Sequence, residues 1–139
     1  MTMTIEEMLA IARTRLNRMS AYDVPAAVAR GAVLVDIRPE AQRRREGTLP
    51  GALVIERNVL EWRVDPASSA KLRLATDHHV EWVIVCSEGY TSSLAAAALQ
   101  DLGIYRATDV IGGYQALKSA GLLAVASEAF HYRRVLAFA

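Results

Sequence analysis

The sequence has little cysteine and no excess of either charge. Its one cysteine, Cys86, excludes an internal disulfide bond and a metal site built from several cysteines. Sixteen lysines and arginines stand against fifteen aspartates and glutamates, so the net charge gives no reason to expect nucleic acid or an anionic membrane as a partner. With no second cysteine to resolve it, any group carried on Cys86 must leave to another molecule.

Long apolar runs are missing as well. No run approaches the ~20 residues of a membrane-spanning helix, and Met1–Thr4 lacks the basic and apolar segments that open a secretory signal. His78 and His79 are adjacent, but no third ligand lies at a metal-ligand spacing. We therefore expect a cytoplasmic protein of one domain, with no membrane contact, no metal and no cofactor.

The most informative stretch is centred on Cys86. The apolar run Trp82–Val85 before it is typical of a buried strand, and Leu94–Leu102 after it consists of strong helix formers closed by Gly103. Ligands of open parallel sheets bind at this end of the strands, and a helix N-terminus there can stabilise a thiolate or an oxyanion. A small buried apolar role for Cys86 stays open, and the charge of Glu88 would oppose a thiolate nearby.

Four motifs in the chain occur in the order found in a known family. The loop Cys86–Thr91 has cysteine first, glycine fourth and threonine sixth, and it resembles the six-residue active-site loop of rhodanese-like sulfurtransferases. Val33–Arg38 resembles the strand of that family that ends in Asp-x-Arg. Gly47–Ala52 resembles its Gly-His-Ile-Pro-Gly-Ala segment, with Thr48 in place of histidine, and Ile111–Leu117 resembles its Gly-Gly-aromatic segment.

The resemblance implies a sulfurtransferase in which Cys86 carries sulfane sulfur as a persulfide. The donor would be a small molecule or protein-bound, and the acceptor a thiol or cyanide. The substrate would be held by backbone N–H groups and by the Thr91 or Ser92 hydroxyl. The residues expected to bind it are Ser87, Glu88, Gly89, Tyr90, Thr91 and Ser92. Because the loop carries Glu88 and no arginine or lysine, we expect thiosulfate to be a poor donor.

Three more residues are expected to support the site. Asp36 and Arg38 follow a strand, where an ion pair between them would brace the neighbouring loops. Arg57 also follows a strand, and either an anion contact or a surface ion pair with a neighbouring glutamate fits its position. One arginine of Arg43–Arg45 could also lie over the Cys86 loop and contact an anionic sulfur donor, although such a run is usually a solvated helix face.

Two other functions stay open. Phosphatases and arsenate reductases of similar architecture need an arginine six positions after the cysteine, where this chain has Ser92. A non-catalytic module would instead use the fold as a regulatory or binding surface.

The whole chain is expected to form an α/β fold. A single rhodanese-like domain over residues 21–122 would have a mostly parallel sheet with helices on both faces. Residues 1–20 would add an amphipathic helix and residues 123–139 a C-terminal tail. The sequence predicts strands near 32–35, 52–55, 82–85 and within 104–111, and helices near 24–30, 39–45, 56–63 and 114–120.

The N-terminal helix has its own start signal. Thr4 and Glu7 form a capping box pattern, and Asp23 is expected to cap the next helix. The N-terminal helix is expected to pack on the domain, while a homodimer contact through it stays open. Its apolar residues recur at helical spacing and are Ile5, Met8, Leu9, Ala12, Leu16 and Met19.

Overall fold

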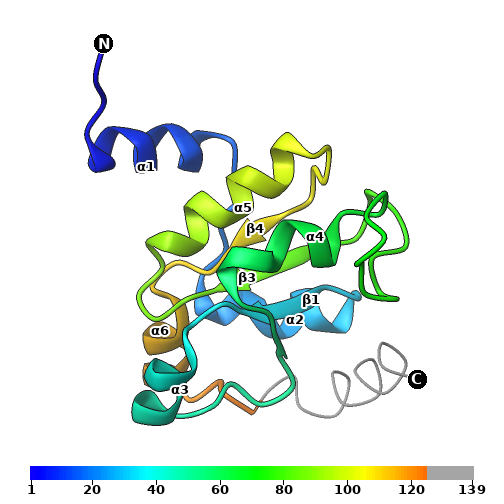
Figure 1. Cartoon of the computed structure of the whole chain (residues 1–139). Helices are drawn as coiled ribbons and strands as arrows, with labels where there is room; N and C mark the ends of the chain where they lie inside the picture. Colours follow the sequence, from blue (N-terminus) through cyan, green and yellow to red (C-terminus); the bar gives the residue numbers. More distant parts are fainter. Residues whose placement is uncertain (125–139) are drawn as a thin grey trace.

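A four-stranded parallel sheet forms the centre of the computed structural model, which describes residues 1–124 (Figure 1). The strands lie in the order β2 (Leu53–Val54), β1 (Val33–Asp36), β3 (Trp82–Val85) and β4 (Thr108–Asp109). Every residue of β1 and β3 is buried, which explains the continuous apolar sequence of β3 and of the first three residues of β1. The expected α/β fold with a parallel sheet is confirmed.

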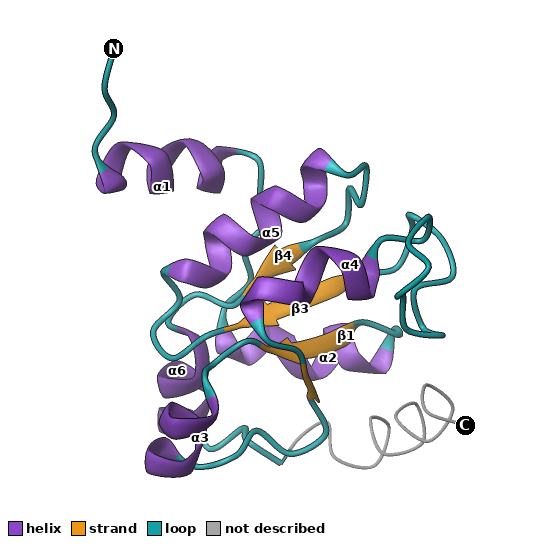
Figure 2. Ribbon diagram, in the orientation of Figure 1, coloured by secondary structure: helices purple, strands orange, loops and turns teal. Residues whose placement is uncertain are grey.

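Helices cover both faces of this sheet. Helices α4 (Leu60–Val64) and α5 (Thr91–Asp101) lie over one face, and α2 (Val24–Ala29) lies over the other (Figures 1 and 2). Helices α3 (Glu40–Glu46) and α6 (Gly113–Ser119) lie beside each other near the carboxyl ends of the strands. Two short 3₁₀ helices complete the described part, η1 (Ala21–Asp23) and η2 (Arg57–Val59).

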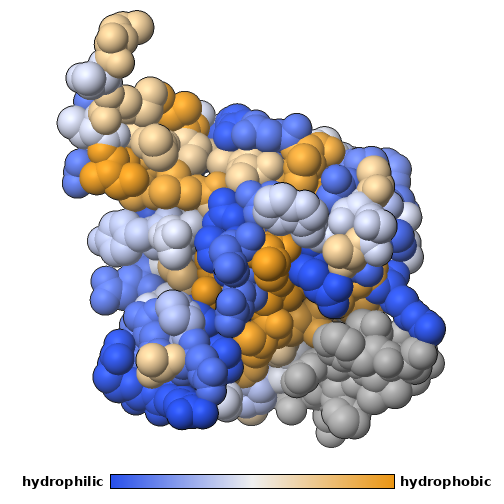
Figure 3. Space-filling model, in the orientation of Figure 1, coloured by the Kyte–Doolittle hydropathy of each residue, from blue (hydrophilic) through white to orange (hydrophobic). Residues whose placement is uncertain are grey.

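The N-terminal helix α1 (Ile5–Thr14) begins at the predicted capping box and packs on α5. It is shorter than the apolar pattern suggested, because Leu16 and Met19 lie beyond its end and Met19 pairs with Val110 in a β-bridge. Its face away from the domain keeps apolar side chains exposed, which Figure 3 shows as orange and tan atoms over α1. These are Ile5, Met8 and Ile11.

Several local predictions need correction. The Asp23 side chain does not cap α2, because it accepts hydrogen bonds from Ser20 at the start of η1 instead. The helix expected over 56–63 is divided into η2 and α4, and the last strand is only two residues long. The tail prediction for residues 125–139 lies outside the described residues.

Within residues 1–124, no helix is both long enough and apolar enough to cross a bilayer.

Candidate active site

The sheet brings three chemistry-bearing residues to one edge. Asp36 ends β1 and pairs in register with Val85, which directly precedes Cys86. Asp109 ends β4 and pairs with Ile84. Because all strands are parallel, their carboxyl ends meet, and the loop after Cys86 stands between the two aspartates.

Cys86 lies at the base of this loop. The residue is 5% exposed, and the Gly89 N–H donates to Sγ across 3.2 Å. Gly89 has a φ of +84°, and a Cβ at this position would lie 2.7 Å from the backbone nitrogen of Gly112. Only glycine fits this conformation and this space, so the fourth position of the loop has a structural reason to be glycine.

In the loop after Cys86, carbonyl oxygens accept hydrogen bonds from the protein, whereas most backbone N–H groups have no protein acceptor within residues 1–124. The Cys86 and Ser87 oxygens accept from Tyr114 and Gln115 of α6 at 2.8 and 3.0 Å. The Gly89 oxygen accepts from two arginines. In contrast, a set of backbone N–H groups donates to no protein atom within the described chain; we call it the amide cup. The amide cup consists of the N–H groups of Ser87, Glu88, Tyr90, Thr91 and Ser92.

Free N–H groups near a sulfur form a site for negative charge. The last members of the amide cup belong to the first turn of α5, where a helix always leaves N–H groups unpaired and adds a partial positive charge. Such a cup can hold an anion or a negatively charged sulfur. Cys86 itself is buried, and one neighbouring N–H, that of Gly89, is directed at its sulfur.

The start of helix α6 packs directly against the Cys86 loop. Gly113 has a φ of +55°, and a Cβ there would overlap the Cys86 carbonyl oxygen and approach the Gly89 nitrogen to 2.9 Å. This close approach lets the N–H groups that follow Gly113 reach the carbonyls of Cys86 and Ser87. The two glycines at the start of α6 thus place the helix directly against the loop.

A buried ion-pair network supports the other side of the loop. Arg38 is fully buried, donates to both carboxylate oxygens of Asp36, and stacks on the Tyr114 ring 3.8 Å from its centroid. Arg38 also pairs with Glu46, whose carboxylate accepts from the Ser87 hydroxyl at 2.9 and 3.0 Å. Asp36 and Arg38 thus form the expected ion pair, and Glu46 connects that pair to the loop.

The pKa values of this network follow from its contacts. Desolvation by burial opposes the charged form of Glu46, but hydrogen bonds from Ser87 and Arg38 outweigh it and lower the pKa of this carboxyl. Desolvation likewise opposes the charge of Arg38, yet the carboxylates of Asp36 and Glu46 raise its pKa. Both groups are therefore held in their charged forms.

A match to the family model of the rhodanese-like domain covers residues 20–120. The chain belongs to the rhodanese-like family. Its structure is similar to that of a protein of unknown function from Rhodopseudomonas palustris, described as a possible tyrosine phosphatase. The two are 31% identical, with 87% of this chain and 93% of that chain covered and a TM-score of 0.77.

Two more distant structures share the fold. A rhodanese-related protein from Thermoplasma volcanium is 20% identical, with 75% of this chain and 92% of that chain covered and a TM-score of 0.58. A rhodanese homolog from Thermus thermophilus is 24% identical, with 73% and 100% covered and a TM-score of 0.53. No curated protein is similar enough in sequence to match.

The rhodanese-like domain uses Ser92 differently from the prediction. The Ser92 hydroxyl is fully buried and donates to Asp109 at 2.8 Å, so it is turned away from the amide cup and contributes only its backbone N–H there. Asp109 also accepts from Ser93 at 2.7 Å and from Arg18 at 2.8 Å. The side chains of Glu88, Tyr90 and Thr91 are exposed.

The other arginines proposed for the site lie elsewhere. Arg57 pairs with Glu61 at 2.7 Å, and within residues 1–124 no hydrogen bond or ion pair joins it to the loop. Arg43 donates to the Arg38 carbonyl, and Arg44 pairs with Glu40. The surface ion-pair interpretation of Arg57 is therefore the one that the contacts favour.

Four residues of the loop's surroundings were not predicted from the sequence. Asp109 could have been found, because it ends the strand expected beside that of Cys86. Glu46, Arg13 and Arg18 carry no local signal, because only the folded chain brings them to the loop.

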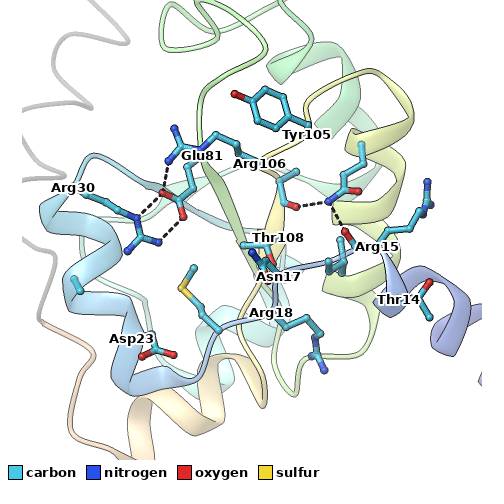
Figure 4. A pocket seen from close by; sticks show the side chains of 15 residues that line it. Thr14, Arg15, Asn17, Arg18, Asp23, Arg30, Glu81, Tyr105, Arg106 and Thr108 are labelled. Atoms are coloured by element: carbon cyan, nitrogen blue, oxygen red, sulfur yellow. Dashed lines mark hydrogen bonds and ion pairs between the residues drawn. The ribbon is translucent and has the colours of Figure 1, made fainter.

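A separate cavity lies away from Cys86. It has a volume of about 800 Å³ and is lined by residues of the N-terminal segment, α2 and the start of β4 (Figure 4). Its arginines are already paired, since Arg30 and Arg106 both contact Glu81. The arginines that line this cavity are therefore each paired with a carboxylate.

Proposed function

We propose that this rhodanese-like domain is a sulfurtransferase that carries sulfane sulfur as a persulfide on Cys86. The observation that carries the proposal is the amide cup beside the Cys86 sulfur, together with the Gly89 N–H that already donates to it. N–H groups in this arrangement stabilise a negative sulfur before and after transfer. The fold alone would not indicate the activity, because one fold serves many functions.

The reaction has two displacements. The Cys86 thiolate attacks the transferable sulfur of a donor, and an S–S bond to Cys86 forms. The donor's own bond to that sulfur breaks, which releases sulfite from thiosulfate, a thiolate from a persulfide, or the enolate of pyruvate from 3-mercaptopyruvate. The acceptor then attacks the outer sulfur. Cyanide leaves as thiocyanate, and a thiol leaves as a persulfide, so Cys86 returns as a thiolate.

The donor is expected to carry little negative charge. Glu88 is exposed beside the amide cup, and within the described residues no cation pairs with it. A doubly charged donor such as thiosulfate would approach this carboxylate at an electrostatic cost. A less charged or protein-bound sulfur donor fits the loop better, with a thiol as the acceptor.

The test is intact-protein mass spectrometry after incubation with thiosulfate, 3-mercaptopyruvate or glutathione persulfide. We expect the mass to rise by one sulfur atom with at least one donor, and to return to its starting value on adding cyanide. The C86S variant should not gain mass. Absence of any gain with all three donors would contradict sulfur transfer and favour the non-catalytic module.

Phosphatase activity is the second candidate, because the Rhodopseudomonas palustris protein of similar structure is described as a possible tyrosine phosphatase. The position that needs an arginine is Ser92, whose hydroxyl is bonded to the buried Asp109. Without a guanidinium to hold the phosphate by two bonds, we expect no hydrolysis of p-nitrophenyl phosphate above that of C86S. Turnover that C86S abolishes would reverse this ranking.

A further inference from the structure

Two arginines that precede the family match reach the Cys86 loop. Arg13, in the last turn of α1, donates from Nη2 to the Gly89 carbonyl oxygen at 2.7 Å, and Arg18 donates from Nη2 to the same oxygen at 3.0 Å. A carbonyl oxygen has two lone pairs, so these two donors fill its capacity. Because both donors are charged, the bonds are stronger than those between neutral groups.

These bonds fix the direction of one member of the amide cup. A trans peptide is planar, and its C=O and N–H point in opposite directions. The described chain has no cis peptide bond. Since the Gly89 oxygen is held toward the N-terminal segment, the Tyr90 N–H of the same peptide is directed to the opposite side. The two arginines therefore act on the loop through its backbone.

The two arginines differ in the charge that they leave at the loop. Arg18 is paired with the buried carboxylate of Asp109, so its charge is neutralised locally. Arg13 bonds to the Ser93 hydroxyl at 3.1 Å and lies 5.6 Å from the centroid of the Tyr90 ring. In the part of the chain that the structure describes, Arg13 forms no ion pair. One positive charge thus remains beside a loop whose own sequence carries only a negative one.

We infer that Arg13 is a positioning residue of the Cys86 loop: it holds the Gly89–Tyr90 peptide and places a positive charge that favours the negative forms of the Cys86 sulfur. Arg18 also donates to the Gly89 oxygen, but its charge is balanced by that of Asp109, so it helps to orient the peptide without adding net charge. This inference rests on the proposed function for the persulfide, but its effect on the thiolate does not require sulfur transfer. The charged and titratable groups around the loop are Arg13, Arg18, Arg38, Glu46, Glu88, Tyr90, Asp109 and Tyr114.

The test compares R13M with R15M. Both variants remove a positive charge from the N-terminal segment, but Arg15 pairs with Asp101 on the surface and does not touch the loop. The rate of Cys86 alkylation by iodoacetamide is measured at one fixed pH. For R13M we expect alkylation to be about threefold slower, because the positive charge beside the loop is removed. R15M should follow the unchanged protein.

A second variant separates charge from geometry. In R13K the charge remains, but an ammonium cannot repeat the planar two-point contact with Gly89 and Ser93. We expect an alkylation rate close to that of the unchanged protein, with slower persulfide loading. If R13M and R15M are alkylated at the same rate, or if R13K is slowed as far as R13M, the inference is overturned. R13Q replaces R13M if thermal unfolding shows that R13M does not fold.

Failure of the two proposals can be told apart. If no donor loads Cys86 while R13M still slows alkylation relative to R15M, sulfur transfer is wrong and the positioning role of Arg13 stands. If Cys86 is loaded and R13M changes neither the alkylation rate nor the loading rate, sulfur transfer stands and the positioning role of Arg13 is wrong.

Discussion

Gly113→Ala tests whether the loop depends on the close approach of α6. Gly113 has a φ of +55°, which costs an alanine about 1–2 kcal/mol in backbone energy. Its Cβ would also overlap the Cys86 carbonyl oxygen and lie 2.9 Å from the Gly89 nitrogen and 3.0 Å from the Ser87 oxygen. All three atoms belong to backbone, which cannot move aside as a flexible side chain does. Overpacking of this kind adds about 1–3 kcal/mol.

The matched control is Gly121→Ala. Gly121 has a similar φ of +71°, but no atom of residues 1–124 lies within 4 Å of a Cβ there, so this variant should lose only the backbone energy of about 1–2 kcal/mol. The free energy of unfolding is measured for both by urea denaturation, and persulfide loading is measured on the folded proteins. We expect G113A to lose about 1–3 kcal/mol more than G121A, and to load sulfur more slowly. Equal losses in the two variants would refute the close approach of α6 to the loop.

Three further predictions concern the charges around the loop. D109N should lower the free energy of unfolding by about 3–5 kcal/mol, because it leaves the largely buried guanidinium of Arg18 without its carboxylate. The control, D101N on the surface, should lower it by less than about 1 kcal/mol. Equal losses in urea denaturation would contradict the buried network. The pKa of Glu46 is lowered in the folded state, so its stabilisation is present above the unfolded pKa and is lost as pH falls through the folded one. Wild-type protein should therefore lose more stability than E46Q on acidification from about pH 5 to pH 3, and parallel pH curves from thermal unfolding would argue against this. E88Q should raise kcat/KM for thiosulfate by about two- to fivefold and leave a neutral persulfide donor unaffected; an unchanged thiosulfate value would show that Glu88 does not repel this donor.

The parts of the fold with strong local signals could be predicted from the sequence. Trp82–Val85 forms a strand as expected, because its apolar run is buried on both faces. The capping box of Thr4 and Glu7 starts α1 where the pattern indicated. The loop after Cys86 follows from the strand–loop–helix order around it. In each case neighbouring residues determine the structure, so a short stretch of sequence carries the information.

The surroundings of the loop could not be predicted in the same way. Arg13 and Arg18 contact Gly89, more than seventy positions along the chain, and their spacing gives no sign of it. The sequence predicts that the Ser92 hydroxyl contacts the substrate, but this hydroxyl donates a hydrogen bond to Asp109. The residues next to Ser92 carry no sign of that bond. The absence of basic residues in the loop therefore understated the positive charge near Cys86.

The Cys86 loop is held by hydrogen bonds to its backbone carbonyl oxygens, so its shape does not depend on the exposed side chains of Glu88 and Thr91. The carbonyls of Cys86, Ser87 and Gly89 are fixed by α6 and by the N-terminal arginines. The side chains of Glu88 and Thr91 make no hydrogen bond within residues 1–124, so the loop does not need them to hold its form. We therefore expect substitutions at these two positions to leave the hydrogen bonds that hold the main chain of the loop unchanged.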